Sequence, residues 1–381
     1  MADSGSDWGL PSQRGLLIRL IGIIGFLMVI MMVMRFHIAI HPPSEFSEHI
    51  SPLAPPNDSA QTVETGLYVH NIYAFEAEKK MFDADGWIWL KYSKSLNDYI
   101  HSHGFMPSSL IHFVNQVDDY DFSLDPSSDQ PILLPDGRYY QRFRFSGHFY
   151  VDELDFRKFP FQTISLPVVV ELRAQRLHRD ASPVQLAVDR ESSGIGAYID
   201  VSGYETKGFE VEGVTEHFMS RMGNPMADEK GSISELRLTV NYEKSLNSTF
   251  LKLILPLITV MLLTLFSPSI APLGWEVRVG IPSTSLLTLI FLQQTYQANI
   301  PDFHYLTFLD SIYNLCYMID LVLFALFLWG AKLYHAADEK DHKVVTAYIE
   351  KVDHRFQIGL TMFLLLGVFT DWWFHFVVFS G

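Results

Sequence analysis

The chain has 381 residues, a formal net charge of −15 and a hydrophobic content of 48%. The acidic balance argues against nucleic acid as a partner. A single cysteine, Cys316, excludes an intrachain disulfide and a zinc site built from several thiolates. The sequence also lacks the motifs of a nucleophile elbow, a helical zinc protease site and a phosphate-binding loop. We therefore expect no enzyme, no bound metal and no cofactor.

The first apolar run extends from Gly15 to Ile40 and contains two arginines. Its uncharged part, Leu20 to Met34, is as long as the longest signal-peptide cores, and it shows no clear A-x-A cleavage pattern. Residues 1–40 are therefore predicted to be a signal anchor or a signal peptide. Either one sends the following residues to the extracellular or periplasmic side. A linker rich in proline and serine is expected over 41–65.

Residues 66–247 alternate between short strand-like segments and turns. The Pro-Asp-Gly turn at Pro135–Gly137 is typical of a β-hairpin, and no helical pattern interrupts the strands. The region is predicted to be an all-β sandwich of the immunoglobulin-like kind. The expected strands are Leu67–Tyr73, Gly86–Tyr92, Tyr139–Tyr150, Ile164–Leu172, Phe209–Gly213 and Ile233–Tyr242.

Residues 248–381 are predicted to be a four-helix transmembrane bundle, because a helix of about 20 apolar residues crosses a bilayer. The second of the four segments carries many hydroxyl and amide groups, which suit a helix that lines water better than one that faces lipid. Asp320 and Asp371 are expected to face protein for the same reason. The segments are Phe250–Phe266, Val277–Ala298, Tyr305–Leu333 and Phe356–Phe379.

Charge predicts the orientation of this bundle. Residues 332–355, which include an expected short loop at 335–353, carry five Lys or Arg residues, whereas residues 299–304 carry none. Positive charge accumulates on cytoplasmic loops. We therefore expect a multi-pass protein in the lipid bilayer of the plasma (inner) membrane, with its β domain outside.

Several motifs resemble the pentameric ligand-gated ion channels of the Cys-loop receptor superfamily. Leu154–Gln162 is similar to the signature loop of that family, whose core reads aromatic-Pro-Phe-Asp. Gln162 replaces the usual Asp. The two flanking cysteines of the family would fall at Asp152 and Leu166, so the chain resembles the prokaryotic-type subunits that lack the disulfide.

The other motifs follow in the order of that family. They are Phe82–Leu90, similar to its second strand, Ile254–Pro256, similar to the proline motif of its first membrane helix, and Arg278–Pro301, similar to its pore helix and the following loop. The resemblance covers Gly66 to Gly381. It implies a homopentamer in which an extracellular ligand-binding domain opens a central ion pathway.

Seven residues of the second segment are spaced by three or four positions and so share one face of a helix. The resemblance implies that they line a pore, with Leu287 at a hydrophobic gate and Glu276 in an acidic ring that favours monovalent cations. It also implies that Arg278 points away from the lumen. Alternatively, the polar face packs against neighbouring helices. Pro282 predicts a kink near Gly280. The seven residues are Glu276, Gly280, Thr284, Leu287, Phe291, Gln294 and Ala298.

The same resemblance implies which residues couple the β domain to the pore helix. Glu76 or Glu78 is expected to pair with Lys244, although such residues also form ordinary surface pairs of little energy. The full set is Glu76, Glu78, Asp155, Phe159, Pro160, Phe161, Lys244, Pro301 and Tyr305.

Two classes of stimulus fit the sequence, a small-molecule agonist and protons. The hairpin Phe218–Gly231, which covers agonists in the family, has three methionines and one aromatic residue, whereas an amine site needs several aromatic faces. Asp83 and Asp85 resemble the start of a calcium loop without its remaining ligands. Candidates for the pocket are Tyr120, Phe122, Arg142, Arg173 and His178, and for proton sensing His148, His178, His217 and His304. A structural role suits each of them too.

The alternative function is a membrane-anchored ligand sensor of the same architecture that does not conduct. Its pore helix would form the same ring without an open pathway, a reading that Pro282 and the bulky Phe291 keep open.

Overall fold

The computed structural model describes residues 49–378, with gaps at 57–60, 119–120, 153, 174–183, 219–230, 299 and 304, together with scattered residues between Gly15 and Val33. The chain separates into two compact units. The β unit comprises residues 43–155 and 161–245. The helical unit comprises residues 1–42, 156–160 and 246–381.

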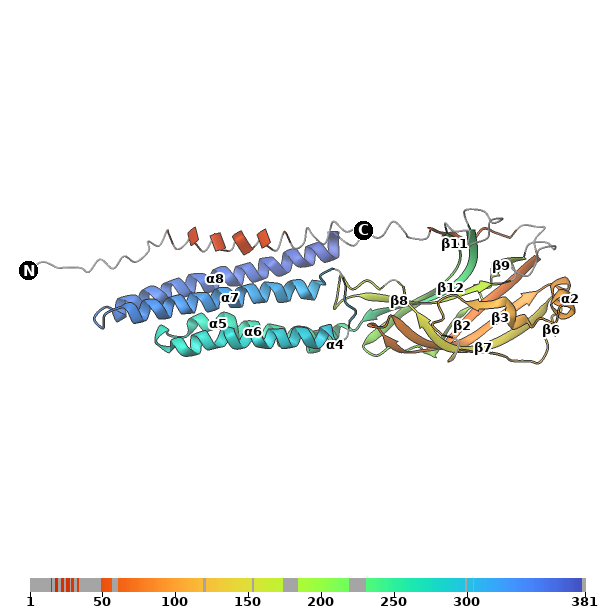
Figure 1. The fold of residues 1–381 in the computed structure, drawn as a ribbon, viewed down its shortest axis with the longest axis horizontal. Helices are drawn as coiled ribbons and strands as arrows, with labels where there is room; N and C mark the ends of the chain where they lie inside the picture. Colours follow the sequence, from red (N-terminus) through yellow and green to blue (C-terminus); the bar gives the residue numbers. More distant parts are fainter. Residues whose placement is uncertain are drawn as a thin grey trace, which may run out of the picture. The chain divides into compact units, whose positions relative to one another are not determined.

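The β unit contains two sheets (Figure 1). Within the described residues, the first sheet has the order β1 (His49–Pro52), β11 (Tyr204–Phe218), β12 (Gly231–Lys244), β8 (Thr163–Leu172) and β4 (Ile111–Phe113). The second has the order β10 (Gly194–Tyr198), β2 (Gln61–Glu76), β3 (Met81–Tyr92), β7 (Tyr139–Tyr150) and β5 (Ser123–Pro126). The short strands β6 (Ile132–Leu133) and β9 (Val184–Val188) pair with β7 and β2. All six expected strands lie within these elements.

Aromatic side chains from both sheets meet in the core of the β unit. The ring of Phe113 on β4 lies 5.0 Å from that of Phe145 and 5.8 Å from that of Phe149, both on β7. Leu236 and Leu238 of β12 are fully buried. Such aromatic pairs add to the apolar burial that holds two sheets together without a disulfide. The predicted β-sandwich is confirmed.

Two parts of the β unit differ from the sequence prediction. Residues 49–52, in the expected linker, form β1 because their main chain pairs with β11, and the Leu53 amide continues the pairing with the Gly213 carbonyl at 2.9 Å. A helix, α2 (Lys94–Ser102), also interrupts the strands. Ser93 caps it by accepting from the Leu96 amide at 3.3 Å, and its buried side chains include Leu96 and Ile100.

The helical unit begins with α4 (Leu246–Thr249), which continues through a π-helical turn (Phe250–Ile254) into α5 (Leu255–Phe266). Two short turns, Ser267–Ser269 and Pro272–Gly274, lead to α6 (Trp275–Gln297). The long helices α7 (Phe308–Ala336) and α8 (His342–Trp373) follow, with a last turn at Phe374–Val378. Figure 1 shows α5, α6, α7 and α8 running alongside one another.

Residues 246–269, 308–336 and 342–377 are long and apolar enough to cross a membrane. Helix α6 is long enough too, at about 35 Å for 23 residues, but its polar side chains set it apart, as predicted. The connection between α7 and α8 is residues 337–341, shorter than the loop expected over 335–353, because the buried Val345, Ile349 and Val352 extend α8 toward its start.

Candidate functional site

The face that the sequence predicts for the pore is an exposed face of α6. Leu287 and Phe291 leave 54% and 59% of their surface exposed, which is unusual for such large apolar side chains. Glu276, Gly280, Thr284 and Gln294 are exposed as well, and so is Ala298 directly after the helix. The residues buried on the other side of α6 are Arg278, Pro282, Ser285, Leu289 and Tyr296. The helix therefore has one packed face and one face left for other contacts.

Arg278 lies on the packed face and forms a buried ion pair with Asp353 of α8. Its guanidinium also lies over the ring of Phe327 on α7, 4.4 Å from the centroid. The charge of Arg278 therefore points away from the exposed face of α6, as the resemblance to the channel family implied. The partner was not anticipated, although Asp353 follows the buried Val345 and Ile349 at four-residue spacing and so belongs to the same stripe.

Other polar groups are buried between the helices. Thr264 of α5 donates to the Ser285 hydroxyl of α6 at 2.7 Å. Asp320 and Asp371 are 1% and 0% exposed, so they face protein, as expected. Helix α6 continues through the buried Pro282 to Gln297, and the kink near Gly280 stays a prediction.

The C-terminal end of α6 is tied to α7 by the carboxylate of Asp310. One oxygen accepts from the Tyr296 hydroxyl and from the side-chain amides of Gln293 and Gln297, at 3.3 and 3.2 Å. The other accepts from the Thr307 amide and hydroxyl at 3.1 and 2.7 Å and closes a capping box at the start of α7. The Thr-x-x-Asp spacing could have identified the cap. No sequence signal joined Tyr296 to it.

Residues 156–160, the centre of the signature-like loop, belong to the helical unit. The first amides of α7 bind this loop: Phe308 donates to the Arg157 carbonyl at 2.9 Å, and Leu309 donates to the Phe159 carbonyl at 3.2 Å. The start of a helix leaves its amides without intrahelical partners, and the loop carbonyls satisfy two of them. The loop and α7 are thus joined through their backbones.

Ring contacts join the same loop to α6. The ring of Phe159 stacks on that of Tyr296, with centroids 5.6 Å apart, so it touches the residue that binds Asp310. The Phe156 ring stacks on Phe303 at 5.2 Å, and its amide donates to the Tyr305 hydroxyl at 3.1 Å. Of the predicted coupling residues, the structure therefore brings Phe159 and Tyr305 into one cluster, and Pro160 is buried beside them in sequence.

The expected pair of Glu76 or Glu78 with Lys244 is not formed. Glu76 pairs with Lys79 of its own turn at 2.6 Å, because a partner three residues away is closer than one on a distant strand. Glu78 is exposed. The Lys244 ammonium lies over the Tyr204 ring, 4.3 Å from its centroid. The charge of Lys244 is thus held against an aromatic face at the end of β12.

The remaining coupling residues are placed as follows. Asp155 is exposed and Phe161 is half-buried, and both belong to the β unit. Pro301 is half-buried in the helical unit, between α6 and α7.

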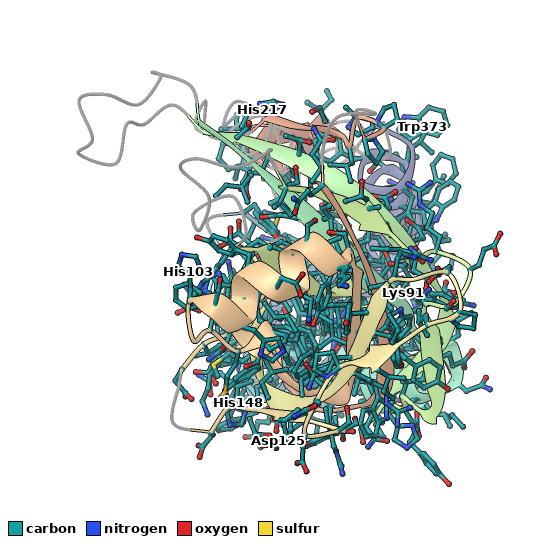
Figure 2. All side chains as sticks on the ribbon, turned by 90° about the vertical axis from the view of Figure 1, so that its right-hand side faces the viewer. Lys91, His103, Asp125, His148, His217 and Trp373 are labelled. Carbon is teal, nitrogen blue, oxygen red and sulfur yellow. The ribbon has the colours of Figure 1, made fainter. Side chains whose placement is uncertain are left out.

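His148, which is labelled in Figure 2, lies among carboxylates on the surface of the β unit. It lies on β7 opposite Asp83 of β3, and its Nδ1 hydrogen-bonds that carboxylate, while its Nε2 lies 3.7 Å from Asp121. The hydrogen bond to Asp83 raises the pKa of His148 above its ordinary 6.5, and the charges of Asp118 and Asp121 act in the same direction against partial burial. With 32% of its side chain exposed, His148 can exchange protons with solvent.

A pocket of about 420 Å³ lies on the second sheet, lined by Tyr68, Trp87, Trp89, Lys91, Tyr140, Arg142, Asp189 and Ser192. Arg142 stacks over Trp87 at 4.3 Å. Burial would raise the pKa of Asp189, but hydrogen bonds from Lys91, Ser192 and Trp89 lower it to about 2. Asp189 is therefore ionised and neutralised by Lys91, while Arg142 faces no carboxylate among the described residues.

Arg142 was a pocket candidate from the sequence, but Trp87 and Trp89 were missed. Trp87 and Trp89 alternate along β3 with the fully buried Ile88, so both indoles lie on the outer face of the strand. The sequence shows this alternation directly. Which residues of other strands join them depends on pairing that the sequence does not reveal, such as Trp89 opposite Arg142.

Other candidates make structural contacts. Phe122 packs on Phe113 at 5.1 Å, the Arg173 amide binds the Leu110 carbonyl at 2.8 Å, and His217 binds the Ser51 hydroxyl at 2.9 Å. Asp85 accepts from Asn71 at 2.6 Å. Within the described ranges, no cluster of three His, Cys, Asp or Glu side chains suits a metal ion. Outside those ranges lie Tyr120, His178, His304, Met219, Met222, Met226 and the side chain of Phe218.

Comparison with known proteins links the chain to an ion channel. No family model matches the chain. A curated protein of Gloeobacter violaceus, named as a proton-gated ion channel, is 22% identical over 293 residues, which cover 74% of this chain and 76% of the relative. The relative is an ion channel, in agreement with the expectation of a protein that is not an enzyme. The match agrees with the motifs, the β-sandwich and the apolar helices that follow it. The chain is therefore similar to a proton-gated ion channel, and its motifs resemble the pentameric ligand-gated ion channels whose signature loop lacks the disulfide.

Proposed function

We propose that the chain forms a homopentameric, acid-activated, cation-selective channel whose pore is lined by α6. The observation that carries this proposal is the division of α6 into an exposed face with Glu276 and a packed face with Arg278. Five copies of the exposed face around an axis would stack like residues into rings. The β unit would lie on the extracellular or periplasmic side, as charge distribution predicts.

Cation selectivity depends on which charged residue of α6 faces the pore lumen. Five Glu276 carboxylates at one mouth would attract cations and repel anions. Arg278, two residues later, would oppose this effect if it faced the lumen, but its ion pair with Asp353 holds it among α6, α7 and α8. Leu287 and Phe291 supply the apolar rings that stop ions by dewetting when the pore is narrow.

Protons are the stimulus that we propose first. The relative is named for proton gating. The pKa of His148 is raised by the carboxylates around it, and its exposed side chain can exchange protons with solvent. Protonation would convert the contacts of His148 with Asp83 and Asp121 into attractive ion pairs. It would thereby tighten the packing of β3, β5 and β7, which carry or adjoin these residues.

A small-molecule agonist is the second candidate, favoured by the pocket around Trp87 and Trp89. Its two indoles offer flat apolar faces, and Arg142 supplies a positive charge without a carboxylate partner among the described residues. A small aromatic or conjugated carboxylate suits that combination.

For coupling, we propose a route from the signature-like loop to the pore helix. Phe159 touches Tyr296 of α6, and Tyr296 binds Asp310 of α7. A shift of the loop would therefore act on both helices at once. Lys244 and the turn at Glu76 would contribute through the ends of their strands.

The test is a recording from the purified protein in planar bilayers. We expect currents to appear as the pH falls from 8 to 4, and the reversal potential in a salt gradient to follow the cation. His148→Gln should shift half-activation to lower pH, whereas the matched change His217→Gln should not. Silence from intact pentamers under acid and under small carboxylates would favour the non-conducting sensor instead. A reversal potential that follows the anion would refute the role of Glu276.

A further inference from the structure

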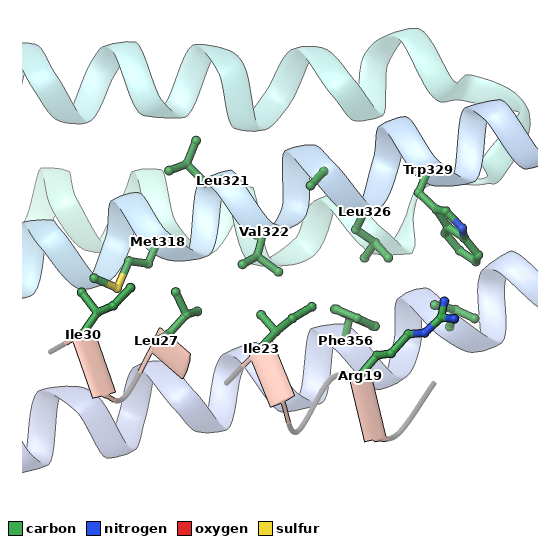
Figure 3. Close-up of a pocket in the computed structure, with 12 residues that line it drawn as sticks. Arg19, Ile23, Leu27, Ile30, Met318, Leu321, Val322, Leu326, Trp329 and Phe356 are labelled. Atoms are coloured by element: carbon green, nitrogen blue, oxygen red, sulfur yellow. The ribbon is translucent and has the colours of Figure 1, made fainter. Parts of the chain in front are cut away.

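A pocket of about 490 Å³ lies within the helical unit, between the N-terminal segment and helices α7 and α8 (Figure 3). The helical residues Ile23, Leu27 and Ile30 form one side. The opposite side is the face of α7 from Met318 to Trp329. Its volume is in the range of small-molecule sites. The coupling route and the α6 face do not use this pocket.

The lining is apolar except at one end. Arg19 is the charged residue among the side chains that line the pocket, and Figure 3 shows it at the same end as Trp329. Within the described part of the chain, no carboxylate lies within ion-pair distance of Arg19. An unmatched cation at the end of an apolar pocket suits an amphiphile with a negative head and a hydrocarbon tail.

The length and position of the pocket match one leaflet of a bilayer. Met318 and Trp329 are eleven residues apart, about 16 Å along α7, and half of the hydrocarbon core is about 15 Å. The charged end is the one nearer the α7–α8 turn, because Trp329 precedes the end of α7 at Ala336. Tryptophan side chains gather at the depth of lipid headgroups.

We infer that this pocket binds one acyl chain of an anionic phospholipid, taken from the leaflet at the α7–α8 turn, with its phosphate on Arg19. The guanidinium can hold a phosphate through two hydrogen bonds, and the aliphatic side chains enclose the tail. A zwitterionic lipid brings a cation of its own beside Arg19 and fits less well. The site does not depend on conduction, so it stands apart from the proposed function.

The inference also requires that the N-terminal segment stays on the mature chain, since Arg19, Ile23, Leu27 and Ile30 belong to it. The protein would then keep a signal anchor that serves as an additional helix against α7 and α8. Removal of this segment by a signal peptidase would take away one wall of the pocket and its only described cation.

Native mass spectrometry of the full-length protein in detergent micelles tests the site. The probes are phosphatidylglycerol and phosphatidylcholine with identical acyl chains. We expect one tightly held phosphatidylglycerol per subunit, preferred about fivefold over phosphatidylcholine, which is the effect of one basic contact at a membrane surface. Arg19→Gln should abolish the preference, whereas Lys332→Gln, an equal change of charge outside the pocket, should leave it.

The tail is tested by filling the pocket. Ala325 lines it, whereas Leu328, three residues further along α7, does not. Ala325→Trp should reduce binding of both lipids at least tenfold, while Leu328→Trp should have little effect. The inference is overturned if Arg19→Gln leaves the lipid preference intact, if Ala325→Trp binds like the parent, if free fatty acid displaces the phospholipid at equal concentration, or if the intact mass shows that the N-terminal segment has been cleaved.

Discussion

The β unit and the helical unit treat charge in opposite ways. In the β unit each described ion pair has at least one partly exposed partner, as with Lys91 and Glu64 at 21% and 25%. In the helical unit Arg278 and Asp353 are nearly inaccessible, at 3% and 2%. Exposed pairs contribute little to stability but respond to solvent pH, whereas a buried charge is costly to leave without its partner. The β unit is therefore suited to sensing pH, whereas the geometry of the helical unit is fixed by its buried polar contacts.

The largest expected effect follows removal of one partner of the buried pair. Asp353→Ala leaves the Arg278 guanidinium buried beside Phe327 without a counter-charge. We expect a loss of about 3–5 kcal/mol of stability per protomer, measured by thermal unfolding of the purified protein. Replacing both residues with a methionine and a leucine should restore most of it. A single variant as stable as the parent would contradict the packing of α6 against α8.

The next effect concerns the hydroxyl that binds Asp310. Tyr296→Phe keeps the ring against Phe159 but removes one donor to the carboxylate. We expect a loss of about 1.5–3 kcal/mol, because hydrogen bonds to charged groups are the stronger ones, together with a shift of half-activation in bilayer recordings.

The matched control is Tyr317→Phe, since that hydroxyl donates to the neutral Gln293 at 2.5 Å. It should cost about 1 kcal/mol. Equal losses in the two variants would show that the charge of Asp310 is unimportant.

A smaller effect is expected from Lys244→Ala, which removes the ammonium from the face of Tyr204. The stability change should be about 0.5–1 kcal/mol. The activation curve should shift because Lys244 ends the strand that leads into the helical unit. Asp136→Asn, which alters an exposed pair with Arg138 within one turn, is the control and should leave gating unchanged. If Lys244→Ala gates like the parent, Lys244 takes no part in coupling.

The smallest effect on stability is expected at His148, and it depends on pH. The folded pKa of His148 is raised, so the extra stability from its protonated form is present below pH 6.5 and is lost as the pH rises through the raised pKa. His148→Gln should therefore destabilise the protein by less than about 1 kcal/mol at pH 5 and not at pH 9. Thermal unfolding at both values measures this difference. An equal effect at the two pH values would exclude His148 as a titrating group.

Local patterns predicted much of the architecture. Alternation of apolar residues located six strands, and the spacing in the second membrane segment identified an exposed face of α6 from Glu276 to Gln294. The short helix α2 escaped prediction because nine residues give barely two repeats of a helical pattern. β1 escaped because its pairing with β11 involves main-chain atoms, which side-chain patterns do not report.

Contacts between distant residues were the part that sequence reasoning could not supply. Asp353 meets Arg278 across 75 positions of the chain, and Tyr296 meets Phe159 across far more. The proposed pair of Glu76 with Lys244 was wrong for the related reason that a local partner, Lys79, competes for the same carboxylate. A charge pattern shows that a partner is needed and leaves open which of several residues provides it.

Residues 156–160 have a practical consequence for work on the isolated β unit. The chain leaves the β unit after Asp155, contributes Phe156 and Phe159 to the helical unit, and returns at Phe161. Both rings are buried, and they stack on Phe303 and Tyr296, which a soluble fragment of residues 43–245 would lack. Such a fragment would expose an apolar, aggregation-prone loop. We expect it to stay soluble only after the apolar residues of that loop are replaced by polar ones.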